Sequence, residues 1–146
     1  MKQLILRLII PLSVISMFLV TKWWFALPID GPDKLYWGFP FPFLGQGFHT
    51  SMSFQFFVLE FIADIIIYFS AWLCFFYLIS TKYKISKLSK LLSKSVYAIA
   101  LVLALGFVLL VSTSNPIFLV KRDYDWKILQ TGHVFIWQET PWPDRD

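Results

Sequence analysis

Three polar residues recur at four-residue intervals within an apolar segment of the sequence. Glu60, Asp64 and Tyr68 would share one face of a helix, because residues four apart are neighbours on a helix surface. Ionisable groups inside a membrane-spanning segment are candidates for carrying a proton or a cation. This spacing therefore raises the hypothesis of an ion or proton path along one helix face.

The depth of the two acids favours a structural interpretation of the same residues. Counted along a helix from Lys82, Asp64 lies about 27 Å and Glu60 about 33 Å away, whereas the hydrocarbon core of a bilayer is roughly 30 Å thick. Both acids would then lie at the far boundary of the membrane, hydrated or paired with a cation. The candidate partners on that side are Lys22, Lys34 and His49.

The remaining chemistry-bearing residue types form no recognisable motif. His49 and His133 are the only two histidines, and no metal-ligand spacing such as HExxH is present. The single cysteine, Cys74, lies within an apolar run, where a small buried hydrophobic role is usual. The sequence thus predicts no catalytic residue, no cofactor and no metal site.

The composition indicates the class of protein in which these residues lie. Of the 146 residues, 58% are hydrophobic and only 15% are charged, and the apolar residues come in long runs. This pattern is typical of an integral membrane protein rather than a water-soluble domain. The net charge of +4 arises mostly from one lysine cluster between two apolar runs, which bilayer topology explains without nucleic-acid binding.

We therefore expect an all-α membrane protein with three transmembrane helices in a single domain, 1–146. The first helix is a retained anchor, since no small-residue cleavage pattern follows it. The expected spans and connections, in chain order, are a helix at about 4–24, an outer loop at 25–52, a helix at about 55–80, a basic loop at 81–94, a helix at about 95–113 and an outer tail at 114–146.

The basic loop predicts the orientation. Its five lysines occur without an acid, and the positive-inside rule places such a loop in the cytoplasm together with the amino terminus. The simpler interpretation is that these lysines only set the topology; the alternative is that they form a face for anionic lipids. They are Lys82, Lys84, Lys87, Lys90 and Lys94.

Two outer segments need a different explanation. The stretch "YWGFPFPFLGQGF", from Tyr36 to Phe48, is aromatic but too rich in proline and glycine for a helix, so we expect an extended interfacial cap on the helix bundle. In the tail, two β-prone runs flank Thr131 and Gly132, which predicts a β-hairpin packed on that cap.

The order of a short first span, "GFPFPF" and a second span containing "ADIIIYF" resembles a pattern in small uncharacterised bacterial multi-pass inner-membrane proteins. The resemblance covers residues 36–80. It implies a bacterial inner membrane and no particular chemistry.

These observations favour a non-enzymatic accessory or assembly subunit of a membrane or cell-envelope complex. Its partners would be the lipid bilayer and either another membrane protein or further copies of the chain. Two hypotheses from other classes remain open. One is a small oligomeric ion or proton conductor using Asp64 and Glu60, and the other is an envelope or lipid-modifying enzyme with His49 as base.

Overall fold

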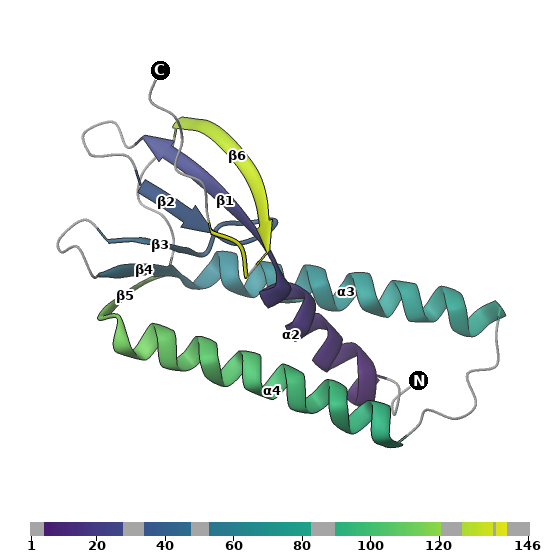
Figure 1. Ribbon diagram of the computed structural model, residues 1–146. Helices are drawn as coiled ribbons and strands as arrows, with labels where there is room; N and C mark the ends of the chain where they lie inside the picture. The colour runs from purple at the N-terminus through teal and green to yellow at the C-terminus, as the bar shows by residue number, and fades with distance from the viewer. Residues whose placement is uncertain are drawn as a thin grey trace.

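The computed structural model describes residues 5–27, 34–47, 53–82, 90–120, 127–135 and 137–139. These residues form a helical bundle with a β-sheet at one of its ends (Figure 1). The helices, in chain order, are a π-helical turn η1 (Ile5–Ile9) that continues into α2 (Ile10–Leu19), and the two long helices α3 (Val58–Lys82) and α4 (Lys90–Thr113).

The short helix α2 packs against both long helices. One hydrogen bond joins α2 to α3, in which the Trp72 indole donates to the Ser16 hydroxyl at 2.9 Å. Another joins α4 to the preceding turn η1, in which the Tyr97 hydroxyl donates to the Leu6 carbonyl. Polar bonds of this kind stabilise helix pairs in an apolar surrounding, where water offers no alternative partner. The segment η1–α2, which we call the wedge, therefore holds α3 and α4 in place.

Among the described residues, six strands form one mixed sheet in the order β5-β4-β3-β2-β1-β6. All neighbouring strands are antiparallel except β4 and β5, which are parallel. The strands are β1 (Val20–Leu27), β2 (Lys34–Trp37), β3 (Leu44–Gln46), β4 (Phe54–Phe57), β5 (Pro116–Leu119) and β6 (Lys127–Phe135).

Connectivity fixes the sheet at one end of the bundle. Strand β1 follows α2 directly, β4 leads directly into α3, and β5 follows α4. The opposite end holds the amino-terminal turn, which lies beside the start of α4, because the Ser93 hydroxyl donates to the Arg7 carbonyl at 3.4 Å. We call these two ends the sheet end and the basic end.

Aromatic side chains fill the space between the sheet and the helices. Phe43 of the sheet region contacts Phe56 of β4, Phe61 of α3 and Phe107 of α4 edge-on, with ring centroids 5.2–6.1 Å apart. A second core, on the sheet itself, contains Ala26, Tyr36 and Phe57, all almost completely buried. Rings of this size bury large apolar areas, so they supply most of the attraction between the two layers.

The expectation of an all-α protein with three transmembrane helices is wrong. The first apolar run is helical only to Leu19 and then becomes β1, which pairs with β2 and β6. The helical part spans about 20 Å, which is too short to cross a bilayer. The cause lies in Thr21–Phe25, where β-branched and aromatic residues favour a strand, and the pairing with the neighbouring β2 and the distant β6 decides the outcome.

The aromatic outer loop and the predicted hairpin also differ from expectation. Residues 25–52 contribute β2, β3 and the end of β1 to the sheet. The tail forms one continuous strand, β6, which passes through Thr131 and Gly132 without a turn and pairs antiparallel with β1. Since Thr131 is a poor residue for a two-residue turn, a long partner strand offers the tail more backbone bonds than a hairpin would.

The two long helices confirm the coarser prediction of apolar, membrane-length segments. Two of the described helices, Val58–Thr81 and Lys90–Thr113, are long and apolar enough to cross a membrane, and only 6% and 11% of their most apolar windows are buried. Helices in the core of a soluble protein would be mostly buried. The outward residues are large and hydrophobic, for example Ile66 at 58% and Leu109 at 63% exposure.

Candidate functional site

The polar stripe of α3 faces the sheet end. Glu60, Asp64 and Tyr68 occupy the first three turns of α3, directly after β4. Asp64 is completely buried, and Glu60 and Tyr68 are half-buried. The stripe therefore lies at the junction of helix and sheet.

Asp64 binds the backbone of the aromatic segment Gly38–Phe43. The Phe41 N–H donates to the Asp64 Oδ1 at 3.0 Å, and the Phe39 N–H donates to the same carboxylate. Bonds from neutral donors to a carboxylate are stronger than bonds between neutral groups. Asp64 thus anchors the segment that connects β2 with β3, and we call Gly38–Phe43 the aromatic arch.

The arch depends on a tight backbone at its start. Gly38 has φ +137°, a conformation that side chains disfavour, and a Cβ there would lie 2.4 Å from the Phe41 carbonyl oxygen. The Phe39–Pro40 peptide is cis, and the Phe43 N–H donates to the Trp37 carbonyl at 3.0 Å to close the arch. The density of glycine and proline in "GFPFPF" follows from this compact turn over a buried acid.

In the described part of the chain, the Asp64 Oδ2 and the Tyr68 hydroxyl have no hydrogen bond, although both atoms are buried and they lie one helical turn apart on the stripe. Buried polar atoms usually have hydrogen-bond partners. Apolar packing therefore does not account for these two atoms.

The structure does not test the predicted pairing of the acids with cations, because the side chains of Lys22 and Lys34 lie outside the described part of the molecule. Lys22 and Lys34 lie in β1 and β2, where their backbones pair with His133 and Ala26 respectively. His49 lies outside the described residues. Asp64 has backbone N–H groups as partners. Its pairing with Lys22, Lys34 or His49 stays a prediction.

His133 contacts the arch from the other side. It is exposed on β6, and its ring meets the Phe39 ring edge-on at 5.3 Å. Among the described residues, no group of three or more His, Cys, Asp or Glu side chains could hold a metal ion. His133 therefore packs against the arch that Asp64 anchors.

The lysines of the basic loop divide between helix ends and the connection. Lys82 ends α3, and Lys90 and Lys94 lie exposed in the first turns of α4, whereas Lys84 and Lys87 lie outside the described residues. Arg7 is exposed beside them at the start of the amino-terminal helix. The basic end thus gathers cations from three separate segments.

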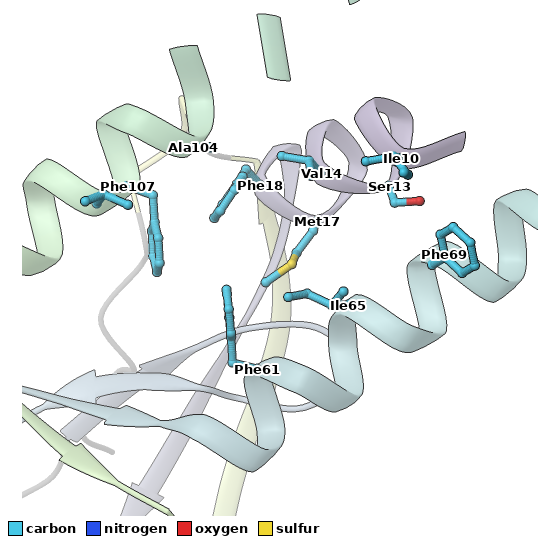
Figure 2. Close-up of a pocket in the computed structure, with 11 residues that line it drawn as sticks. Ile10, Ser13, Val14, Met17, Phe18, Phe61, Ile65, Phe69, Ala104 and Phe107 are labelled. Atoms are coloured by element: carbon cyan, nitrogen blue, oxygen red, sulfur yellow. The ribbon is translucent and has the colours of Figure 1, made fainter. Parts of the chain in front are cut away.

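An apolar cavity of about 330 Å³ lies between α2, α3 and α4 (Figure 2). In the figure, Met17, Phe61 and Phe107 point into this space from the three helices. Ser13 is the one polar residue among its described lining residues, and its hydroxyl donates to the Ile9 carbonyl at 2.7 Å. Sequence reasoning missed the cavity, because the spacing of Phe61, Ile65 and Phe69 also fits a lipid-facing stripe.

No family model matches this chain, and no curated protein or solved structure matches it either.

Proposed function

We propose that this protein is a membrane-embedded accessory or assembly subunit whose sheet binds another envelope protein at the bilayer surface. The helical bundle anchors the sheet, and strand β6 supplies the binding edge. The observation that carries this proposal is the exposed edge of the sheet. In the described part of the chain β6 has a neighbour on one side only, and Phe135 and Trp137 stack at 4.9 Å beside it while 45% and 68% exposed.

An edge strand of nine residues is a template for a strand from another chain. Large aromatic residues at such an edge provide the apolar contacts that dominate many interfaces. A partner that adds a strand to β6 would cover the stacked pair at the same time. This geometry supports a binding role for the sheet.

The orientation that we propose is an inner-membrane one, with the basic end in the cytoplasm and the sheet outside. All nine acids of the sequence lie within residues 30–64 or 123–146, whereas residues 1–29 and 65–122 contain none. The segments at the basic end carry Lys2, Arg7 and the five lysines of the loop. An uncompensated cluster of this kind favours the cytoplasmic side.

The conductor hypothesis receives less support from the geometry. Asp64 accepts bonds from the arch backbone and is completely buried. No Asp, Glu, His, Lys or Arg follows it in the sequence before Lys82. A charge that reached Asp64 would meet about 27 Å of helix without another ionisable side chain of these types. The enzyme hypothesis rests on His49, which lies outside the described residues.

Site-specific photo-crosslinking in cells tests the proposed role. A photoreactive residue at Gln130, exposed on β6, should form an adduct with one protein that mass spectrometry identifies, whereas one at Leu109, on the lipid-facing side of α4, should not. An adduct of twice the chain's mass would identify a homo-oligomer as the partner.

Two matched variants show whether the β6 edge makes the contact. Trp137→Ser should abolish the Gln130 adduct, and Phe118→Ser, which changes an equally exposed aromatic residue on the opposite edge strand β5, should leave it unchanged. An adduct that survives Trp137→Ser and disappears in Phe118→Ser would contradict the assignment of β6.

A further inference from the structure

We propose that the cavity between α2, α3 and α4 binds one acyl chain of an anionic phospholipid, whose headgroup lies among the cations of the basic end. This inference rests on the proposed placement in a bilayer and adds a specific lipid site to it.

The walls of the cavity exclude a polar ligand. Apart from Ser13, whose hydroxyl is already bonded within its own helix, every described lining residue is apolar. The cavity adjoins the outward faces of α3 and α4, whose exposed residues are large hydrophobic ones. In a bilayer, the material next to those faces is hydrocarbon, and an apolar cavity that opens to it binds hydrocarbon rather than water.

The size of the cavity selects an acyl chain over a protein helix. A helix about 10 Å across occupies roughly 420 Å³ for every turn of 5.4 Å, which exceeds the whole cavity of about 330 Å³. A cavity of 150 Å³ holds a six-carbon ring; in proportion, about 330 Å³ holds roughly a dozen carbons. This volume corresponds to most of one acyl chain.

The depth of the cavity fits one leaflet. Along α2 it extends from Ile10 to Phe18, about 12 Å of helix. Arg7 lies one turn before Ile10, so a chain that starts beside Arg7 and ends beside Phe18 covers about 17 Å. Half of a hydrocarbon core is roughly 15 Å. The acyl chain of a lipid in the leaflet next to the basic end is therefore long enough to fill the cavity.

The charge at the basic end favours an anionic headgroup. Arg7, Lys90 and Lys94 are all exposed there, and the Ser93 hydroxyl holds the Arg7 backbone against the start of α4. No acid occurs in the sequence from residue 1 to 29 or from 65 to 122 to neutralise them. Phosphate oxygens complement such a cluster, and each nearby cation strengthens the binding of anionic lipids.

Aromatic rings gather at the opposite end of the cavity. The rings of Phe61 and Phe107 stack nearly parallel, with centroids 6.0 Å apart and an interplanar angle of 7°, and Phe56 and Phe43 lie behind them. Figure 2 shows Phe61 and Phe107 on α3 and α4 at one side of the space. A chain entering from the basic end would thus stop at the aromatic core below the sheet.

Electron paramagnetic resonance of spin-labelled lipids tests the proposal on the full chain in phosphatidylcholine vesicles. Phosphatidylglycerol carrying the label near the end of one acyl chain should show a motionally restricted component beyond that of the ordinary lipid boundary. Phosphatidylcholine labelled at the same carbon should show only the boundary component. Equal restricted fractions for the two headgroups would overturn the anionic assignment.

A matched pair of variants locates the chain. Ala104→Phe places a ring in the cavity and should weaken retention of the labelled phosphatidylglycerol about tenfold, while Ala98→Phe, the same change at an exposed position of α4, should leave retention unchanged. Unchanged retention in Ala104→Phe would overturn the proposal. Because Ala104→Phe could disturb the bundle, Ile65→Trp fills the cavity from α3 and must give the same loss.

The two proposals fail in different ways. If the protein does not enter the bilayer, no variant and no headgroup gives any restricted lipid component, and the bilayer placement itself is wrong. If it enters the bilayer without a lipid site, wild type, Ala104→Phe and Ala98→Phe all give the same boundary component for both lipids.

Discussion

The sheet end and the basic end of the bundle are built on different principles. At the sheet end, aromatic rings from sheet and helices interlock, and Asp64 holds the arch by two backbone bonds. At the basic end, only η1 and the first turns of α4 are seen to meet through hydrogen bonds, at Leu6 and Arg7. Packing of many rings fixes one end of the molecule, whereas the other end offers a few bonds and a group of exposed cations.

Because of this contrast, the buried acid and the exposed lysines are stabilised by different kinds of partner. A carboxylate in a closed aromatic layer is stable only when donors surround it, and the arch supplies them. Exposed cations without acids need an external anion or a headgroup layer.

The largest effect is expected from Gly38→Ala at the start of the arch. The added Cβ would lie 2.4 Å from the Phe41 carbonyl oxygen at a φ of +137°, so we expect a loss of about 3 kcal/mol in the free energy of unfolding. Thermal unfolding in mild detergent, followed by circular dichroism, measures it. Gly106→Ala on α4, where no atom lies within 4 Å of the new Cβ, should change stability by no more than about 1 kcal/mol.

A smaller effect is expected from replacing the acid that holds the arch. Asp64→Leu leaves the N–H groups of Phe39 and Phe41 without their acceptor and should cost about 2 kcal/mol, whereas Asp64→Asn retains an acceptor oxygen and should cost about 1 kcal/mol. Hydrogen exchange of the Phe41 amide reports the local effect. Equal protection of that amide in wild type and Asp64→Leu would mean that the carboxylate does not anchor the arch.

The smallest effect is expected at the contact between α2 and α3. Trp72→Phe removes the indole bond to Ser16 and should cost about 1 kcal/mol. In a Ser16→Ala background the same change should cost less, because the acceptor is already missing. Identical losses in both backgrounds, measured by thermal unfolding, would show that the bond does not contribute to the packing of the wedge.

The sequence predicted the long helices better than the sheet for a physical reason. An apolar run of membrane length is a local signal, and α3 and α4 follow it closely. Strands β3 and β5 have only three and four residues, and β5 pairs with β4, from which α3 and α4 separate it in the sequence. The sheet forms only when all of these strands pair, so the sequence of a single segment does not predict it.

The candidate site was predictable in part. The four-residue spacing identified Glu60, Asp64 and Tyr68 as one helix face, and they lie in the first turns of α3. The depth estimate, which placed both acids at the far boundary of the membrane, stays a prediction. The partner of Asp64 could not be predicted, because backbone N–H groups carry no sequence signature. The glycine and proline pattern of the arch indicated a compact turn, and its position over Asp64 emerges only from the fold.

The most direct test concerns the separation of the two ends by a bilayer. In a Cys74→Ser background, Thr131→Cys on the exposed face of β6 and Ser86→Cys in the connection between α3 and α4 are treated in whole cells with a membrane-impermeant thiol reagent. With the sheet end outside and the basic end in the cytoplasm, Thr131→Cys should react at once and Ser86→Cys should react only after the membrane is permeabilised. Immediate reaction at both positions, or at Ser86→Cys alone, would contradict this orientation.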